Sequence, residues 1–448
     1  MCMDVKNLKN KKVTVLGAAR SGLAAAKLLR NVGALPFVSD ISTRDQKAEQ
    51  AEQLQEWSIP FEFGRHSQRV FDADFMVLSP GIAVKSDIVR RFLQQRIPVY
   101  SEIEVASWFC KAPIIAVTGS NGKTTTTTLI GEMLRTIYPD AIVAGNIGQP
   151  FSSFVLNSHA DSWAVVEVSS FQLETIERFH PRQAVILNFA PNHLDRYDSY
   201  QDYLRAKWRI TENLSVDDLL IFNAVDAELL NWVDKLNVKK IGFHINGSPQ
   251  EAAWFDGKSL YLYGTKLMNV DEMILRGKHN YMNAMAAALA AGNAKVPVEA
   301  IRRTLKTFAG VEHRLEFVTE KEGVKYINDS KATTVESLSF ALQSFREPVV
   351  LIAGGKDKGS DFSRLNPLIK EHVKELILIG DAADKMSKAW QGLKPIHRPQ
   401  SFEEAIHTAK DAARPGEVVL LSPACASFDM FKDFEDRGRQ FKELVNRL

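Results

Sequence analysis

Thr118-Gly-Ser-Asn-Gly-Lys-Thr-Thr125 is the most informative stretch of this chain. It follows the apolar run Pro113-Ile-Ile-Ala-Val117 and precedes a helical pattern, which is the strand–loop–helix setting of a phosphate-binding loop. Gly119 and Gly122 allow the backbone to curl so that successive N–H groups face one centre. The stretch therefore predicts an α/β domain that binds a nucleotide where a parallel strand ends.

Two side chains of this loop have defined roles in phosphate-binding loops. Lys123 would reach the β- and γ-phosphates, and the Thr124 hydroxyl would ligate Mg²⁺. Val117 replaces the first glycine of the usual pattern, so the loop is a variant. A lysine-bearing helix start without a ligand is the alternative interpretation, but the strand–loop–helix context favours nucleotide binding.

The rest of the chain alternates short β-rich apolar runs with helical patterns, which indicates parallel sheets flanked by helices. The alternation of strand and helix patterns is interrupted from Phe243 to Leu275, where we expect a hairpin about Asp256-Gly257. The alternation resumes after Gly310. The fold class is therefore α/β with three domains. We expect a Rossmann-like N-terminal domain over residues 1–101, a central P-loop ATPase-type domain with a parallel sheet over residues 102–310, and a Rossmann-like C-terminal domain over residues 311–448.

Bulk composition excludes several classes of partner. The chain of 448 residues carries 56 Lys+Arg against 54 Asp+Glu, so its net charge gives no electrostatic case for nucleic acid or an anionic membrane. Cys2, Cys110 and Cys425 are far apart and odd in number, which fits a reducing compartment. Because no apolar run reaches the ~18 residues of a membrane span and no signal peptide is visible, we expect a cytoplasmic protein.

A second glycine loop, Gly17-Ala-Ala-Arg-Ser-Gly22, closes the first strand and opens a helix. Asp40 ends the next strand, as in dinucleotide-binding βαβ units. However, Ala19 occupies the place of the middle glycine, which makes close approach of a dinucleotide pyrophosphate less favourable. A nucleotide-type ligand other than NAD is the preferred interpretation, and a tight turn without a ligand is the alternative.

Polar side chains at the ends of two central strands suggest a metal site. Glu167 ends one strand, and His193 and Asp195 lie in the loop after the next, so all three are expected at one sheet edge beside the phosphate loop. Taken singly, Asp195 could be a helix cap and His193 a loop imidazole. Lys207 lies on an amphipathic helical pattern, which by itself indicates a surface lysine.

These motifs in combination resemble those of the Mur ligases of peptidoglycan synthesis. The resemblance in the first two thirds of the chain rests on the phosphate loop, Gly145-Asn-Ile-Gly148, Glu167-Val-Ser-Ser-Phe-Gln172, Asn192-His-Leu-Asp195 and Gly277-Lys-His-Asn-Tyr-Met-Asn283. The carboxyl-terminal motifs resemble the branch of the family that joins D-glutamate to UDP-N-acetylmuramoyl-L-alanine. They are His313-Arg-Leu-Glu316, Ile327-Asn-Asp-Ser-Lys-Ala-Thr-Thr334, Gly354-Gly-Lys-Asp-Lys358 and Ser422-Pro-Ala-Cys-Ala-Ser-Phe-Asp429.

The resemblance implies three binding sites and a metal site. The UDP sugar would contact Arg20, Ser21, Asp40, Gly81, Asn146 and His193. ATP would contact Gly119, Ser120, Asn121, Gly122, Lys123, Thr124, Thr125, Asn280, Asn283, Arg314 and Asp329. D-Glutamate would contact Lys331, Thr333, Lys358, Ser427 and Phe434, although solvated surface lysines are the alternative for Lys331 and Lys358. Two Mg²⁺ ions would be held by Thr124, Glu167, His193 and by Lys207 as a carbamate formed with CO₂.

The implied mechanism is ATP-dependent amide ligation through an acyl phosphate and a tetrahedral intermediate. Lys123, His193, Lys207 and Arg314 would be its catalytic residues, mostly by positioning and charge neutralisation. We expect a monomer that binds small molecules only, namely UDP-N-acetylmuramoyl-L-alanine, D-glutamate and ATP. The alternatives are a sister amide ligase such as folylpolyglutamate synthase, an NAD-dependent oxidoreductase, and a non-catalytic nucleotide switch.

Overall fold

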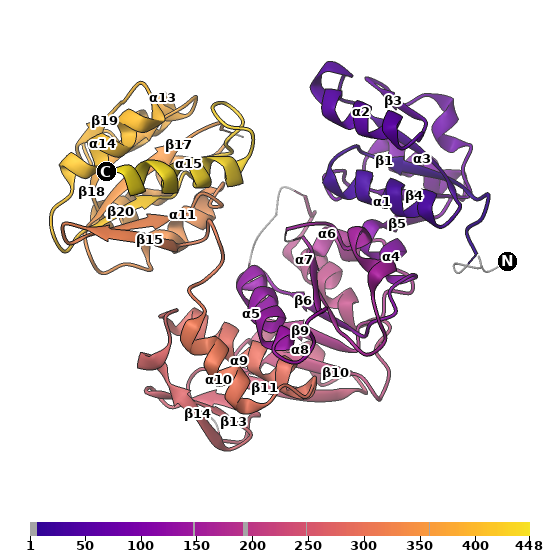
Figure 1. Ribbon diagram of the computed structural model, residues 1–448, viewed down its shortest axis with the longest axis horizontal. Helices are drawn as coiled ribbons and strands as arrows, with labels where there is room; N and C mark the ends of the chain where they lie inside the picture. Colours follow the sequence, from indigo (N-terminus) through magenta and orange to yellow (C-terminus); the bar gives the residue numbers. More distant parts are fainter. Residues whose placement is uncertain (1–6, 147, 191–195, 248, 358) are drawn as a thin grey trace. The chain divides into compact units, whose positions relative to one another are not determined.

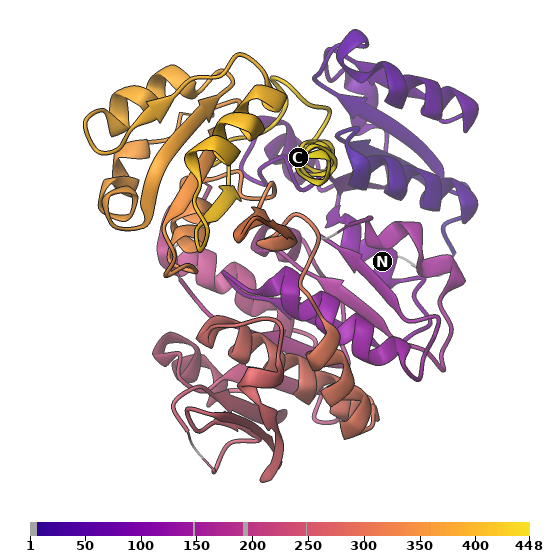
Figure 2. The same ribbon diagram turned by 60° about the vertical axis from the view of Figure 1, so that its left-hand side comes forward.

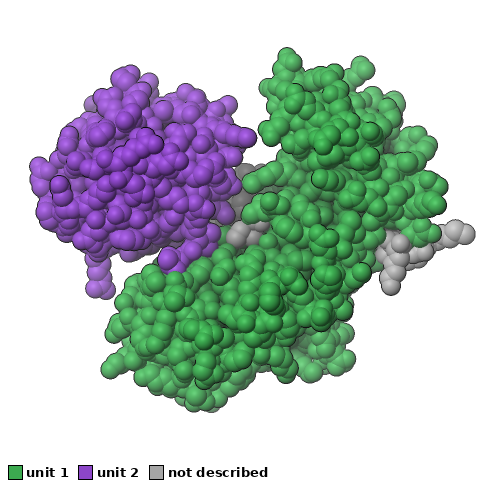
Figure 3. Space-filling view, in the orientation of Figure 1, with its two compact units in different colours: residues 1–308 green, residues 309–448 purple. Residues whose placement is uncertain are grey.

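The computed structural model describes residues 7–146, 148–190, 196–247, 249–357 and 359–448. The chain forms two compact units, Met1–Phe308 and Ala309–Leu448 (Figure 3). Two of its three sheets belong to the first unit and one to the second (Figure 1). Among the described helices, none combines the length and the apolar character that crossing a bilayer requires.

The first sheet is parallel throughout and has the strand order β3-β2-β1-β4-β5. Its strands are β1 (Lys12–Leu16), β2 (Leu35–Asp40), β3 (Phe61–Phe63), β4 (Phe75–Leu78) and β5 (Val99–Ser101). Its helices are α1 (Arg20–Asn31), α2 (Ala48–Glu56), α3 (Asp87–Gln94) and α4 (Glu102–Ser107). Because all strands run the same way, the loops that follow β1, β2, β3 and β4 open at one edge of the sheet.

The central sheet has the order β14-β13-β12-β11-β10-β9-β6-β8-β7. Its parallel part contains β6 (Ile114–Thr118), β7 (Ile142–Gly145), β8 (Ala164–Glu167), β9 (Gln183–Ile186), β10 (Leu219–Asn223), β11 (Lys239–His244) and β12 (Ala253–Phe255). The hairpin expected about Asp256-Gly257 joins β12 to antiparallel β13 (Ser259–Leu262), which is followed by β14 (Thr265–Asn269). The sheet is thus parallel where the phosphate loop lies and antiparallel at one edge.

Helices cover both faces of the central sheet. They are α5 (Lys123–Arg135), α6 (Ser170–Leu173), α7 (Tyr200–Trp208), α8 (Ala227–Val233), α9 (Lys278–Asn293) and α10 (Val298–Thr307). Alternate residues of β6 enter different cores: Ile115 and Val117 belong to the cluster that contains α9, and Ala116 to the cluster of the opposite face. The alanine-rich α9 packs beside α5, the helix of the phosphate loop, in both ribbon views (Figures 1 and 2).

The second unit has a six-stranded sheet of order β15-β16-β20-β17-β18-β19, antiparallel only between β15 and β16. Its strands are β15 (Glu316–Lys321), β16 (Val324–Asn328), β17 (Val349–Gly354), β18 (Val373–Ile379), β19 (Ile396–His397) and β20 (Val418–Leu421). Its helices are α11 (Val335–Leu342), α12 (Asn366–His372), α13 (Ala383–Trp390), α14 (Phe402–Ala412) and α15 (Phe434–Arg447). The predicted α/β class with largely parallel sheets is confirmed, whereas the domain boundaries at residues 101 and 310 stay predictions.

Candidate active site

The phosphate loop has the backbone that its glycines predict. It connects β6 to α5, with Gly119 at φ 153° and Gly122 at φ 83°. A Cβ atom on Gly122 would lie 2.3 Å from Asn283 Oδ1, so only glycine allows this approach between the loop and α9. Gly122 and Asn283, both predicted ATP contacts, are therefore neighbours.

A residue that the sequence did not single out braces the loop from the next strand. Asn188, just after β9, accepts a hydrogen bond from the Asn121 N–H at 2.9 Å, and its side-chain amide donates to the Asn121 carbonyl at 3.1 Å. The Ser120 N–H donates to the Asn188 carbonyl at 3.0 Å. Ser120 Oγ also lies 2.9 Å from the Tyr203 hydroxyl of α7. The loop is thus held from two sides in the shape that a phosphate group requires.

Two lysines converge on one carbonyl of this loop. Lys123 Nζ donates to the Gly119 oxygen at 2.9 Å, and Lys207 Nζ donates to the same oxygen at 2.8 Å. Lys207 is 2% exposed, so the pattern-based interpretation of a surface lysine is wrong. Burial, and next the charge of Lys123, hold the pKa of Lys207 well below the usual range, against the opposing effect of Glu167. A buried lysine with a lowered pKa can present the neutral amine that reaction with CO₂ needs.

A buried carboxylate lies at the end of β8 in the same sheet. Glu167 is 2% exposed, and its Oε1 accepts a hydrogen bond from Asn146 Nδ2 at 3.1 Å. Its Oε2 atom has no hydrogen-bond partner among the described residues. Together with the buried Thr124, it offers the oxygen ligands that Mg²⁺ prefers. His193 and Asp195, also predicted near this site, lie outside the described residues.

The candidate metal ligands among the described residues are Thr124 and Glu167. Within the described ranges, no group of three or more His, Cys, Asp or Glu side chains lies close enough to hold a metal. Mg²⁺ usually binds through one or two carboxylates and keeps waters or substrate phosphates as its other ligands. The donor set of Thr124 and Glu167 fits that mode of binding.

A cavity of about 580 Å³ opens where the first sheet meets the β7–α6 part of the central domain. The five described residues predicted for the UDP sugar all line it: Arg20, Ser21, Asp40, Gly81 and Asn146. Gly17 is required here, because its φ is 97° and a Cβ atom would lie 2.8 Å from Ser79. The cavity thus begins at the glycine loop after β1 and the first residues of α1, where helix N–H groups suit phosphate.

Asp40 supports this cavity in a way that the motif does not suggest. Its Oδ2 accepts from the Ala18 N–H at 2.7 Å and its Oδ1 from the Ser42 N–H at 2.8 Å. Burial alone would raise the pKa of Asp40, but these backbone N–H groups, with the charge of Lys47, hold it below the usual value. Asp40 therefore stays ionised and fixes the glycine loop.

Arg196 ties the wall of the cavity to the central domain. Its guanidinium donates to the carbonyls of Pro80 at 2.8 Å and Ile82 at 3.2 Å, both of which belong to cavity-lining residues. The same group lies 3.8 Å from Glu174 Oε2 and 4.8 Å above the ring of Phe171. Arg196 belongs to none of the sequence motifs. Its hydrogen-bond partners lie 116 and 114 residues earlier in the chain, so the local sequence does not indicate them.

The second unit holds its predicted ATP contacts in a strained turn. Arg314 lies between His313 at φ 64° and Leu315 at φ 44°, a backbone region that non-glycine residues rarely adopt. Asp329 Oδ1 accepts from the Leu315 N–H at 3.1 Å, and its Oδ2 accepts from Ser422 Oγ at 2.8 Å. Burial raises the pKa of Asp329 to about 7, although these hydrogen bonds and the charge of Arg314 oppose the shift.

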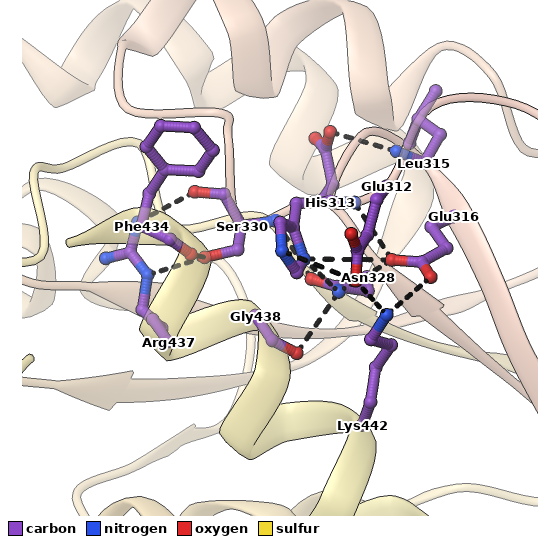
Figure 4. A network of polar contacts seen from close by, with 11 residues as sticks. Glu312, His313, Leu315, Glu316, Asn328, Ser330, Phe434, Arg437, Gly438 and Lys442 are labelled. Carbon is purple, nitrogen blue, oxygen red and sulfur yellow. Dashed lines mark hydrogen bonds and ion pairs between the residues drawn. The ribbon is translucent and has the colours of Figure 1, made fainter. Parts of the chain in front are cut away.

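A polar network holds the other side of this turn (Figure 4). Asn328 Nδ2 lies 2.9 Å from His313 Nδ1, 3.0 Å from Glu316 Oε2 and 3.2 Å from the Gly438 oxygen. Lys442 of α15 donates to Glu316 Oε1 at 3.0 Å. The turn that carries Arg314 is therefore fastened to β16 and to α15.

Two of the predicted D-glutamate contacts, Lys331 and Phe434, lie near each other at the start of α15. Lys331 Nζ lies 5.8 Å from the ring centre of Phe434, and the Lys331 N–H donates to the His313 oxygen at 3.0 Å. The Thr333 N–H donates a hydrogen bond to the Lys331 carbonyl oxygen at 2.9 Å. The Ser427 side chain is buried. Lys331 is half-buried rather than fully solvated. Lys358 lies outside the described residues.

Arg437 organises these loops and was also missed by motif reasoning. It is buried, and its guanidinium donates to Ser330 Oγ at 2.9 Å, to the Ser330 oxygen at 2.8 Å and to the Cys425 oxygen at 3.2 Å. Desolvation lowers its pKa to about 10, so the guanidinium stays charged at neutral pH. One cation thereby joins the loops that contain Lys331 and Ser427.

Comparison with known proteins assigns the family. Sequence profiles described as "Mur ligase MurD-like, N-terminal domain", "Mur ligase middle domain" and "Mur ligase, glutamate ligase domain" match residues 11–101, 117–291 and 313–425. A curated protein of Salinibacter ruber, named UDP-N-acetylmuramoylalanine–D-glutamate ligase, is 44% identical over 461 residues that cover 100% of both chains. A protein of the same name from Koribacter versatilis is 41% identical over 451 residues, covering 100% of this chain and 99% of its own. The chain belongs to the Mur ligase family.

Solved structures agree on the fold. The UDP-N-acetylmuramate-alanine ligase of Thermotoga maritima matches with a TM-score of 0.63 at 19% identity, covering 98% of this chain and 100% of its own. The MurF ligase of Thermotoga maritima, solved with ADP, matches with a TM-score of 0.60 at 15% identity over 100% of both chains. The three-domain α/β fold of Mur ligases is thus confirmed for this chain.

Family membership fixes the class of reaction. As a Mur ligase the chain is an ATP-dependent ligase of peptidoglycan synthesis that uses ATP and Mg²⁺. The alternatives of an NAD-dependent oxidoreductase and of a nucleotide switch are therefore wrong. The phosphate loop and the buried Glu167 supply groups of the kind that ATP and Mg²⁺ require.

Proposed function

We propose that this Mur ligase joins D-glutamate to UDP-N-acetylmuramoyl-L-alanine in the cytoplasm, with conversion of ATP to ADP and phosphate. The observation that carries the proposal is the full-length match, at 41–44% identity, to curated proteins named UDP-N-acetylmuramoylalanine–D-glutamate ligase. The match extends through the glutamate ligase domain at residues 313–425, where the amino-acid substrate would be chosen.

The proposed sites follow the predicted domains. Residues 1–101 would hold the UDP sugar, with Arg20, Ser21, Asp40 and Gly81 joined by Asn146 and His193 of the central domain. Residues 102–310 would hold ATP on the phosphate loop and on Asn280 and Asn283. Residues 311–448 would supply Arg314 and Asp329 to ATP, and Lys331, Thr333, Lys358, Ser427 and Phe434 to D-glutamate. The enzyme would work as a monomer.

The reaction would begin at the terminal carboxylate of the UDP substrate. An oxygen of this carboxylate attacks the γ-phosphorus of ATP, the bond to the β-phosphate oxygen breaks, and ADP leaves. Lys123 and Arg314 neutralise the charge of the transferred group, which is the main task of a protein in phosphoryl transfer. The amine of D-glutamate then attacks the acyl carbon. The resulting tetrahedral intermediate loses a proton from its nitrogen to solvent, expels phosphate and yields the amide.

The chain's own residues also account for the proposed metal sites. Thr124, Glu167 and His193 would hold one Mg²⁺, and Lys207 as a carbamate would help to hold a second. Lys207 first loses one proton to become a neutral amine, which bonds to the carbon of CO₂ and releases a second proton to solvent, so the buried side chain becomes an anion. When bound, Mg²⁺ neutralises phosphate charge and fixes phosphate geometry.

The test is phosphate release from ATP in the presence of UDP-N-acetylmuramoyl-L-alanine. D-Glutamate, L-glutamate, L-lysine and no amino acid are compared, and the product is identified by mass. Lys123→Ala should abolish release, whereas Lys258→Ala, an exposed lysine in the β12–β13 turn, should leave it unchanged. Release that requires D-glutamate supports the proposal. Release that requires another amino acid, or occurs without one, would assign the chain to a sister ligase.

A further inference from the structure

His66 lines the cavity without belonging to any predicted motif. It follows β3 and lines the cavity together with Asp40 and Ile41, which end and follow β2. His66 Nδ1 lies 2.7 Å from Ser39 Oγ, and Ser39 is fully buried. One ring nitrogen is therefore fixed by the protein while the ring itself borders the space for the ligand.

A hydrogen-bond relay determines which nitrogen carries the proton. Ser39 Oγ lies 2.9 Å from Glu62 Oε1, which also accepts from the Ser67 N–H at 2.9 Å. Burial alone would raise the pKa of Glu62, but the hydrogen bonds from Ser67 and Ser39 hold it below the usual value, so Glu62 is ionised. A carboxylate can only accept, and Ser39 has one hydrogen. Ser39 therefore donates to Glu62 and accepts from His66, which places the His66 proton on Nδ1.

The relay leaves Nε2 of the neutral ring with a lone pair. Within the described part of the chain, no hydrogen bond to this atom is recorded, although the ring is half-buried. Burial lowers the pKa of His66, while the facing carboxylates Glu62 and Asp40 oppose the shift. Arg20, on the same cavity, adds a positive charge. The neutral form thus prevails at neutral pH and offers a fixed acceptor.

The position of His66 in the sheet indicates which part of a nucleotide sugar it meets. Phosphates of such ligands bind at the glycine loop after β1, and the ribose binds near the end of β2. His66 lies after β3, one strand farther from the glycine loop, where the base is expected. Ile41 presents an apolar side chain there that is 66% exposed, as a platform for a base requires. Each oxygen of Asp40 already accepts a hydrogen bond from a backbone N–H, so this carboxylate has fewer free acceptor sites for the ligand.

We propose that His66 is a specificity-determining residue whose Nε2 accepts a hydrogen bond from the imide N–H of uracil. The proposal rests on the proposed binding of a UDP sugar in this cavity. Cytosine carries a lone pair and no hydrogen at the corresponding ring nitrogen, so it would face Nε2 with a second acceptor. Ser39 and Glu62 act as positioning residues that keep the proton on the far nitrogen of the ring.

The test is calorimetric binding of UDP-N-acetylmuramoyl-L-alanine, UDP and CDP to the full chain at pH 7.5. His66→Asn keeps an amide near the Nδ1 position, where it can still contact Ser39, but removes the Nε2 acceptor. His66→Gln instead places an amide oxygen near the Nε2 position. Loss of one hydrogen bond with an unpaired donor corresponds to about tenfold in affinity. We expect about tenfold weaker UDP binding and reduced preference over CDP for His66→Asn, and partial recovery for His66→Gln.

A pH series separates this role from a purely structural one. Protonation converts Nε2 into a donor, so affinity for UDP-N-acetylmuramoyl-L-alanine, whose two phosphates do not titrate in this range, should be constant above the His66 pKa and fall by up to tenfold per pH unit below it. His66→Gln should lack this decline, whereas His159→Asn, an exposed histidine of the same unit, should keep it. Equal affinity and equal pH profiles in wild type and His66→Asn would overturn the role of His66 alone. Failure of the wild type to bind the UDP sugar would overturn the proposed function as well.

Discussion

Replacement of Gly438 by alanine tests the packing that holds the Arg314 turn. Gly438 lies within α15, where an added Cβ atom would lie 2.2 Å from His313 Nδ1, 2.7 Å from Cε1 and 2.8 Å from Cγ. His313 is 3% exposed and is joined to Asn328 at 2.9 Å (Figure 4). The ring therefore cannot yield to the methyl group without giving up a buried hydrogen bond or changing the backbone beside Arg314.

The expected change in the free energy of unfolding follows from effects of opposite sign. In a helix without tertiary contacts, alanine is more favourable than glycine by about 0.5–1 kcal/mol. Overpacking of a close-packed site costs about 1–3 kcal/mol, and a buried polar group left unpaired costs a further 1–3 kcal/mol or so. We therefore expect Gly438→Ala to destabilise the second unit by about 3 kcal/mol and to lower kcat through displacement of Arg314.

The assay is native-state hydrogen exchange of the β16 and α15 amides, with kcat measured on the same preparations. Gly292→Ala is the matched control, because Gly292 also lies in a helix but its Cβ would meet only Ile301 Cδ1, at 3.9 Å. In a His313→Ala background the collision is absent, so Gly438→Ala should become neutral or stabilising. Stabilisation by Gly438→Ala in the wild-type background, as in the control, would refute the reasoning.

Three further predictions concern other buried groups. Asp329→Asn should flatten the pH dependence of the second unit's free energy of unfolding. Because folding raises the Asp329 pKa to about 7, the contribution of Asp329 to stability is complete below about pH 4 and is lost as pH rises through 7. Urea titration at several pH values measures this dependence. Lys207 should give a carbamate carbonyl signal in NMR spectra with ¹³C-labelled bicarbonate, and Lys207→Arg should lack that signal and the activity. Arg196→Ala should raise KM for the UDP substrate by about tenfold with little change in KM for ATP. Lys85→Ala, which removes only an exposed ion pair with Asp198, should change neither KM.

The sequence predicted those parts of the protein that depend on local pattern. Apolar runs of strand length, each ended by a glycine turn, were sufficient to predict the α/β class, and the phosphate loop marked the end of β6. The hairpin about Asp256-Gly257 was predictable because its turn residues are adjacent. Each of these features is specified within about ten residues of chain, so no tertiary information is needed.

Lys207 shows where local pattern fails. Its helix, α7, carries Arg205 and Lys207 in its last turn, and lysines in such a pattern usually reach solvent. Its burial depends on the Gly119 carbonyl, 88 residues earlier in the chain, and on the ring of Tyr203, 4.8 Å from Nζ. Asn188, Arg196 and Arg437 were missed for the same reason: each donates to backbone carbonyls that only the tertiary structure brings within reach.

In the cavity of the first unit, a match to a motif does not by itself determine the role of a residue, because the role also depends on the hydrogen bonds that the residue already makes. Asp40 stands where dinucleotide-binding proteins place a carboxylate for the ribose, and it does line the cavity. Yet each of its oxygens already accepts a backbone N–H, and one of these donors belongs to the glycine loop itself. His66 offers a further acceptor at Nε2, because Ser39 and Glu62 place its proton on Nδ1. Asp40 would then fix the glycine loop after β1, while His66 would read the base.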